Sequence, residues 1–279
     1  MKKHAFAVLG LLALTSSSAF ADRRLNSLKE DKAVRHRKLL VSHRFELTPL
    51  FESTINADFR HIVGGGVKLE YHFSDMLSFG VIGVGSTAID TKLVDRIVPT
   101  LEADTNDATR EPSQAEFKDR LNTMPVHGAA YISLTPWYGK LAAFSQAFVA
   151  FDFYFQAGVA FAQLKNDCPT SVCSDTHPGV SKDNGDGTST PPDLNPNNDP
   201  PLNSGTKAGL YLGGGIHVFL NDFVALDLSF RDYAFSDNPS GADYNADLFV
   251  SKKDNRFTHH LFGGIGIAIF FPTTVKRTP

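Results

Sequence analysis

The 279-residue chain has little cysteine, little net charge and, beyond its N-terminus, no long uninterrupted apolar stretch. Its two cysteines, Cys168 and Cys173, are too few for a four-ligand zinc site. They lie close together in a polar segment, and in an exported chain we expect them to form a disulfide, with two free thiols as the alternative. The net charge of -3 does not supply the strongly basic face that nucleic-acid binding requires, so we predict no nucleic-acid partner.

The N-terminus has the features of an export signal. Lys2 and Lys3 precede an apolar run at 5–14, and the residues AFA at 19–21 fit the small-x-small rule for cleavage. The apolar run is too short to span a bilayer, which takes about 20 residues. We predict that residues 1–21 are a signal peptide cleaved after Ala21. The residue directly after the cleavage site is Asp22 and not cysteine, which argues against a lipoprotein.

The next segment, 22–40, is basic and is predicted to lie in the periplasm. Basic clusters beside an anionic membrane gain about 1 kcal/mol per charge. The segment is therefore a candidate for contact with lipid, peptidoglycan or a partner protein. A solvated lead-in to the folded domain is the equally weighted alternative.

The rest of the chain is rich in phenylalanine and glycine, which suit strands and tight turns. In FDFYFQAGVAF, at 151–161, the phenylalanines alternate with Asp152, Tyr154 and Gln156, and a period of two indicates a strand. Asp152 therefore faces away from the phenylalanines. The same alternation occurs at 44–54, 62–73, 128–138, 207–220, 223–235 and 258–271, and less regularly in the glycine-rich run 77–89. Each of these strands is long enough to cross a membrane when tilted, which takes about 9–11 residues.

Short and long connections alternate between these strands. The short ones are 74–76, 139–146 and 221–222, and the longer ones are about 55–60, 90–127, 164–206 and 237–257. This pattern is typical of outer-membrane barrels. We predict an all-β fold, an eight-stranded antiparallel transmembrane β-barrel over 41–271, with short periplasmic turns, long external loops and a C-terminal tail at 272–279. A short helix is expected around 114–122.

A soluble sandwich or a lipocalin-like barrel is the alternative, with the apolar face of each strand turned inward. Large aromatic residues near the strand ends favour the membrane barrel, because such residues form girdles at the membrane interfaces. They are Phe45, Phe73, Trp137, Tyr138 and Phe271. The last strand also resembles the C-terminal assembly signal of outer-membrane barrels, with Gly264, Gly266, Ile269 and Phe271 at its characteristic places.

Two blocks resemble the outer-membrane β-barrel domain proteins of myxobacteria and their relatives. The first, 43–83, carries an R-F-E-L-x-P strand from Arg44 to Pro49 and, after an aromatic residue in the short loop, the sequence YHFSD at 71–75. The second, 135–161, carries PWYGK and the FDFY strand. The resemblance implies an outer-membrane barrel. Because some members belong to the gliding-motility machinery, it also indicates a part in a multi-protein envelope complex.

Seven charged residues are predicted to face the barrel interior. They are Arg44, Glu46, Lys68, Glu70, Asp152, Asp227 and Arg231. An eight-stranded barrel is only wide enough for its own side chains or one small ligand, and buried charges must be paired. We therefore expect a packed network of ion pairs, with a pore lining or a proton path as the alternative.

One loop segment, KDNGDGTSTPPD at 182–193, resembles a calcium-binding loop. Asn184, Asp186 and Asp193 occupy the third, fifth and twelfth places, but Lys182 stands where the first carboxylate should be. Since a hard cation needs about six or more oxygens, several of them charged, we favour a polar external loop without metal.

The histidines are interpreted as packing residues. The adjacent His259 and His260 face opposite ways on a strand and cannot chelate one ion together. His72 and His217 are expected to meet inside the barrel, without a carboxylate or cysteine cluster at ligand spacing. No metal site or cofactor is predicted.

The sequence alone leaves three possible functions for this protein. The leading hypothesis is a non-enzymatic barrel in the outer membrane, surrounded by lipid, that binds other envelope proteins through its external loops or segment 22–40. A narrow channel for small solutes is the second. The third is a lipid-modifying enzyme at the external rim, for which Ser86, His127 and His260 are the candidate residues.

Overall fold

The computed structural model describes residues 41–101, 114–143, 147–167, 182–183, 189–190, 204–242, 244 and 252–273. The predicted signal peptide, segment 22–40 and most of the C-terminal tail lie outside these residues. So do Cys168 and Cys173, and the loop residues Asn184, Asp186 and Asp193, so the disulfide and the calcium loop stay predictions from the sequence.

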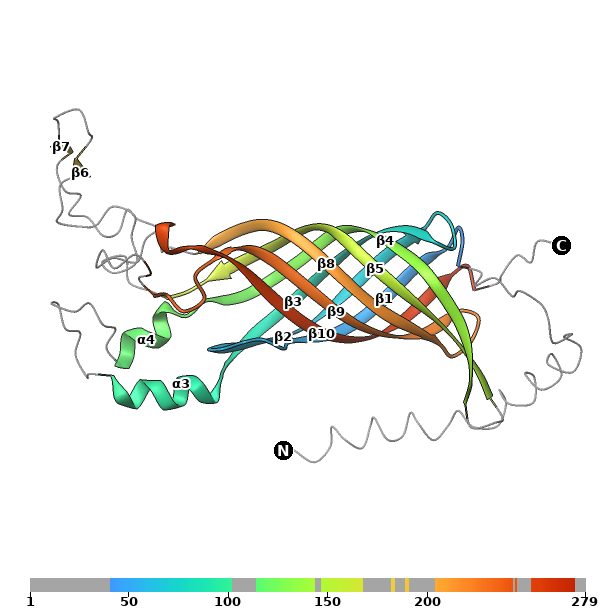
Figure 1. Cartoon of the computed structure of the whole chain (residues 1–279), viewed down its shortest axis with the longest axis horizontal. Helices are drawn as coiled ribbons and strands as arrows, with labels where there is room; N and C mark the ends of the chain where they lie inside the picture. The colour runs from blue at the N-terminus through green and yellow to red at the C-terminus, as the bar shows by residue number, and fades with distance from the viewer. Residues whose placement is uncertain are drawn as a thin grey trace, which may run out of the picture. The chain divides into compact units, whose positions relative to one another are not determined.

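The fold is a closed barrel of antiparallel strands, as predicted (Figure 1). Its strands are β1 (Phe45–Thr54), β2 (Arg60–His72), β3 (Leu77–Asp90), β4 (Thr123–Ala143), β5 (Ala147–Lys165), β8 (Gly205–Phe219), β9 (Val224–Asp237) and β10 (Arg256–Phe271). Each strand pairs with its sequence neighbour in the barrel, and β1 closes the ring on β10, with Phe45 opposite Phe271. Two short strands, β6 (Lys182–Asp183) and β7 (Ser189–Thr190), form a separate two-stranded sheet.

The alternation of short and long connections is confirmed. Four residues join β2 to β3 and β8 to β9, whereas the connection between β3 and β4 runs from 91 to 122. We call the end with the long connections the external end and the other the periplasmic end. Figure 1 shows α3 (Lys92–Ile97) and α4 (Gln114–Arg120) at the external end, and α4 confirms the helix expected around 114–122. Two 3₁₀ turns, η1 (Val98–Thr100) and η2 (Lys252–Asp254), also lie in long connections.

The apolar face of the strands points outward. On β5, Phe153 and Phe155 are 42% and 51% exposed, whereas Asp152 and Tyr154 are 3% and 2% exposed. The same division holds around the ring, where Phe51, Leu69, Phe79, Ile132, Leu212, Phe230 and Ile265 are all exposed. A soluble barrel or sandwich would bury these side chains. The distribution is that of a transmembrane β-barrel, and the soluble alternative is wrong.

The hairpin of β4 and β5 is longer than predicted. The segment 139–146 was expected to be a turn, but β4 continues to Ala143 and pairs with β5 as far as Ala147. The external ends also extend further, because β4 begins at Thr123 and β5 ends at Lys165. The register shifts between Leu134 and Trp137, around Pro136. Proline has no N–H for the ladder, and the shift lets the pairing continue past it.

Inward-facing glycines make room for large side chains in the lumen. A Cβ on Gly80 would lie 2.5 Å from the hydroxyl of Tyr131, and one on Gly264 would lie 2.5 Å from Nη1 of Arg231. The lumen therefore holds tyrosine and arginine side chains that an eight-stranded barrel would otherwise be too narrow to contain.

No helix among the described residues is long and apolar enough to cross a membrane.

Candidate functional site

Lys68 is the centre of the polar network in the lumen. Its Nζ lies 2.8 Å from Oε1 of Glu46 and 3.1 Å from Oδ2 of Asp227, and none of the three side chains is exposed to solvent. The ammonium also stands over the ring of Tyr154, 4.9 Å from its centroid, while the Tyr154 hydroxyl donates to Asp227. One cation thus binds two carboxylates from β1 and β9 across the lumen.

His217, on β8, extends this network toward β5. Its Nδ1 lies 2.9 Å from Oδ1 of Asp152, and its Nε2 lies 3.6 Å from Oε1 of Glu46. The ring of Tyr154 stacks on the imidazole with centroids 4.6 Å apart. Asp152, the carboxylate inside the phenylalanine-rich strand, therefore has a partner that holds it in the interior.

A second cluster lies around Glu52 on β1. Its Oε2 accepts from Nη1 of Arg231 at 2.9 Å, and its Oε1 lies 2.6 Å from Nε2 of His127. Nη2 of Arg231 lies 3.8 Å from Oδ2 of Asp227, which joins this cluster to the one around Lys68. Glu52 was not among the predicted lumen charges, although it shares the inward face of β1 with Glu46.

The remaining two predicted charges, Glu70 and Arg44, are also buried. Glu70 accepts from the hydroxyls of Ser78 and Tyr131, the latter at 3.0 Å. Arg44, just before β1, donates to the carbonyls of Asp222, Phe270 and Pro272. Burial lowers the pKa of Arg44, with Asp222 acting in the opposite direction. Arg44 therefore ties the start of β1 to the periplasmic turn between β8 and β9 and to the end of β10.

The structure brings the predicted lumen residues together and adds four tyrosines that sequence analysis did not single out. Tyr131, Tyr154, Tyr211 and Tyr233 are 2% exposed or less, as are Arg231 and Lys68. The alternation that identified the charges also placed these rings on the inward face. With side chains of this size packed across it, the lumen is sealed at the level of the charge network.

The expectation that no carboxylate cluster lies at ligand spacing from His72 is wrong. His72 does have carboxylates at ligand spacing, because its ring and the carboxylates of Glu46 and Glu70 have ligand atoms within 4.8 Å of one another. Strand pairing causes this, since Glu46 lies opposite Glu70 in the ladder between β1 and β2. Lys68 already supplies positive charge to Glu46, so the group behaves as an ion-pair centre and favours no additional cation.

The three candidate catalytic residues do not form one site. Ser86 and His127 are close, with Oγ 3.3 Å from Nδ1, and Glu52 binds the other ring nitrogen of His127. However, the Ser86 hydroxyl donates to the carbonyl of Met124, and an activated nucleophile must instead donate to its base. His260 lies apart, with Nε2 3.1 Å from Oδ2 of Asp237. His127 and Glu52 are fully buried in the lumen.

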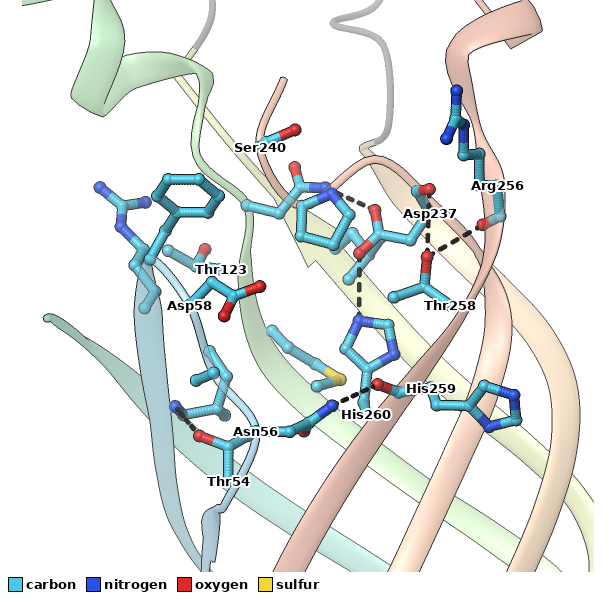
Figure 2. Close-up of a pocket in the computed structure, with 18 of the residues that line it drawn as sticks. Thr54, Asn56, Asp58, Thr123, Asp237, Ser240, Arg256, Thr258, His259 and His260 are labelled. Atoms are coloured by element: carbon cyan, nitrogen blue, oxygen red, sulfur yellow. Dashed lines mark hydrogen bonds and ion pairs between the residues drawn. The ribbon is translucent and has the colours of Figure 1, made fainter. Parts of the chain in front are cut away.

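A pocket of about 480 Å³ lies at the external end of the barrel (Figure 2). Its lining comes from the β1–β2 loop, from β4 and β10, and from residues that follow β9. Figure 2 shows the carboxylate of Asp58 and the imidazole of His260 directed into this space. We call it the vestibule. Its floor includes the apolar side chains of Ile62, Met124 and Leu164.

Hydrogen bonds fix the vestibule wall. Asp237 accepts from Asn122 at 2.6 Å and from the backbone N–H of Asn238, in addition to its contact with His260. Asn56 donates to the carbonyl of His259 and accepts from the N–H of Leu261. The wall is therefore a set of paired groups on strand ends.

The long connection between β3 and β4 packs against this end of the barrel. Val94, Phe117 and Leu121 form a small buried cluster, against which Phe59 of the β1–β2 loop also packs. Arg60 donates to the carbonyls of Leu121 and Lys118 at the end of α4 and pairs with Asp90 at 3.0 Å. The described part of the external end is thus ordered by contacts with the barrel.

Three solved structures with a similar fold are the N-terminal β-barrel domain of OprF from Pseudomonas aeruginosa, the outer membrane protein OprG from the same organism, and Ail, the attachment invasion locus protein of Yersinia pestis. Identity is 9% in each case, and the alignments cover 82% of this chain and 98%, 96% and 99% of the respective chains. The TM-scores are 0.34, 0.36 and 0.33, and no residue role carries over at such values. No protein-family model and no curated protein matches the chain.

Proposed function

We propose that this chain is an outer-membrane protein that acts as a non-enzymatic structural and interaction component of a multi-protein envelope complex. The gliding-motility machinery is the example that the family resemblance indicates. Outer-membrane lipid surrounds the barrel, and other envelope proteins bind the external end or segment 22–40. The apolar outer wall and the N-terminal export signal support this location.

The sealed lumen is the observation that carries the proposal. Lys68, Glu46 and Asp227 are fully buried and paired across the interior, and the four tyrosines fill the space around them. A conducting pore needs a continuous path of water through the barrel. These side chains fill the space that such a path would take. Recognition by this protein therefore takes place at its ends and on its outer wall.

The external end has the order that recognition requires. The vestibule is lined by polar groups held on strand ends, and α4 is tied to the barrel through Arg60. Binding residues are often carried by loops that a rigid scaffold positions. We assign partner binding to this end rather than to the short periplasmic turns.

Site-specific photo-crosslinking in intact cells tests the proposal. A photoreactive amino acid at Asp58, in the vestibule, should capture a distinct envelope protein that mass spectrometry of the adduct identifies. The matched position is Asn221, in the periplasmic turn between β8 and β9. If Asp58 captures no protein while Asn221 does, the assignment of the external end is wrong.

Conductance in a planar bilayer separates this proposal from a small-solute channel. The purified mature protein should give no steady single-channel currents, since the lumen is filled. Sizeable, reproducible currents that change when Lys68 or Arg231 is replaced would establish the channel function and remove the anchor function.

A further inference from the structure

The outer wall of the barrel carries a groove that the charge network and the vestibule do not explain. It has a volume of about 680 Å³, in the range of about 300–1,000 Å³ that is typical of ligand pockets. Its sides are formed by the side chains of Phe153, Phe155, Leu212, Ile216, Leu228 and Phe230, which are all exposed except the half-buried Ile216. The groove exists because Gly214, which faces outward between Leu212 and Ile216, has no side chain to fill it.

Few protein atoms lie close to the outward face of Gly214. A Cβ on Gly214 would meet only the carbonyl oxygen of Tyr154 at 3.2 Å and a ring carbon of Phe155 at 3.6 Å. The flanking Gly213 and Gly215 also line the groove. The missing side chain at Gly214 therefore leaves a furrow on an apolar surface, whereas Cβ atoms on Gly213 and Gly215 would point toward the lumen tyrosines Tyr211 and Tyr154.

A carboxylate lies in this furrow. Asp232, on β9, faces outward between Phe230 and Ala234, and the residue is 8% exposed. Its Oδ2 lies 2.6 Å from Nδ1 of His259 on the neighbouring strand. Its Oδ1 is buried and has no hydrogen-bond partner among the described residues. An unpaired carboxylate oxygen on a lipid-facing wall is costly and points to a ligand that supplies the missing donor.

The depth of Asp232 in the membrane restricts which part of a lipid can donate a hydrogen bond to it. Leu210 pairs with Ala234 and Phe257 pairs with Ser236, so both lie nearer the external ends of the strands than Asp232. Both are 58% exposed, which means that the apolar belt continues beyond the carboxylate. The donor must therefore sit at the level where acyl chains begin, below the outer part of a lipid headgroup. His259, whose ring points away from the vestibule in Figure 2, lies at this level too.

We propose that this groove binds a membrane lipid of the external leaflet with an amide-linked, hydroxylated chain region. One acyl chain lies along Gly213–Gly215, and the amide N–H or the adjacent hydroxyl donates to Oδ1 of Asp232. His259 holds the carboxylate in place through Oδ2. The proposal rests on the membrane location proposed above, since only then does the outer wall contact lipid.

Native mass spectrometry tests the proposal. The delipidated mature protein is incubated with one lipid at a time and released from detergent, and the lipid that stays bound is measured. Palmitoyl sphingomyelin carries an amide N–H and a hydroxyl where its chains begin. Dipalmitoyl phosphatidylcholine has the same headgroup and no donor, and dipalmitoyl phosphatidylethanolamine has its donor only at the outer end of the head. Because a hydrogen bond to a charged group is a strong one, the protein should retain sphingomyelin about tenfold more than phosphatidylcholine.

Two variants locate the binding. Asp232→Leu removes the acceptor without adding charge, and the ratio of sphingomyelin to phosphatidylcholine should fall to about one. Gly214→Phe fills the furrow and should reduce sphingomyelin retention to the level of phosphatidylcholine. Gly83→Phe is its matched control, because Gly83 faces outward on β3 and a Cβ there has no atom within 4 Å. That variant should bind as the unmodified protein does.

Other outcomes overturn the inference. Equal retention of all three lipids, or a preference for phosphatidylethanolamine, would show that Asp232 does not recognise a donor at this depth. A Gly214→Phe variant that matches Gly83→Phe would show that the lipid does not lie in the groove. Heat-modifiable electrophoretic mobility shows that each variant is folded. A protein that stays in solution without detergent and retains no lipid would instead refute the membrane location itself.

Discussion

Replacing Lys68 by methionine removes the charge at the centre of the lumen and keeps the length of the side chain. Glu46 Oε1 and Asp227 Oδ2, at 2.8 and 3.1 Å from Nζ, then face a site without a cation. Breaking a buried ion pair by removing one partner costs about 3–5 kcal/mol. We expect Lys68→Met to lower the free energy of unfolding by this amount, which corresponds to about a hundred- to several-thousand-fold in the equilibrium constant.

The measurement is a urea titration of the mature protein folded into phosphatidylcholine vesicles. Trp137, the single tryptophan, faces outward and reports unfolding by fluorescence, while heat-modifiable mobility reports the closed barrel. Lys207→Met is the matched control, because Lys207 on β8 makes no ion pair within the described part of the chain. Its replacement should change stability by no more than about 0.5 kcal/mol.

A second substitution separates loss of charge pairing from loss of packing. If unpaired carboxylates cause the destabilisation, adding Asp227→Asn to Lys68→Met should recover more than about 1 kcal/mol, since coupled neighbours show interaction energies of about 0.5–3 kcal/mol. A cost below about 1 kcal/mol for Lys68→Met would refute the reasoning. So would a double variant in which the two losses simply add.

Four further results are expected. Gly80→Leu should cost about 1–3 kcal/mol, because its Cβ would lie 2.5 Å from the Tyr131 hydroxyl, while Gly83→Leu on the open outer face should leave urea unfolding unchanged. Arg60→Ala should speed thermolysin cleavage within 91–122 and leave the barrel resistant, because Arg60 holds the end of α4; equal cleavage rates would show that the apolar cluster alone orders this connection. Ser86→Ala and the unmodified protein should be equally inactive on short-chain esters, since the Ser86 hydroxyl donates to a backbone carbonyl; hydrolysis that the substitution abolishes would establish the enzyme. Intact mass of the protein from membranes should fit a chain that begins at Asp22, and a mass that includes 1–21 would show that the signal is retained.

The strand pattern was predictable because the physical cause acts locally. Side chains of successive strand residues point to opposite faces, so the alternation of phenylalanine with Asp152, Tyr154 and Gln156 determines the inward face of β5 from sequence alone. The alternating lengths of the connections then order the strands around the ring. Neither inference needs a contact between distant residues, and both are confirmed.

The partners within the lumen were not predictable in the same way. They depend on ladder register, which places Glu46 opposite Glu70 and brings His72 to the same carboxylates. Glu52 was missed for a different reason, because its inward position was visible but its contacts with Arg231 and His127 cross from β1 to β9 and β4. A one-residue change of register would have altered all of these pairs.

The longer hairpin of β4 and β5 shows where composition misled the prediction. The segment GKLAAFSQ at 139–146 contains a glycine and small residues, which are common in turns. Gly139 instead lies opposite Phe151, and a Cβ there would be 2.5 Å from the Phe151 ring. The glycine thus accommodates a cross-strand neighbour, and the pairing continues toward the periplasmic end.

Gly264 shows how lumen packing also explains a residue of the C-terminal motif. It fits the assembly signal of outer-membrane barrels, and it also lies opposite Glu52 in the ladder between β1 and β10. The guanidinium of Arg231 passes over this position to reach Glu52, and a Cβ would come within 2.5 Å of Nη1. A larger residue would force the guanidinium of Arg231 to shift from its place beside the buried Glu52 carboxylate. The ion pair therefore favours glycine at this position for a reason that is independent of the assembly signal.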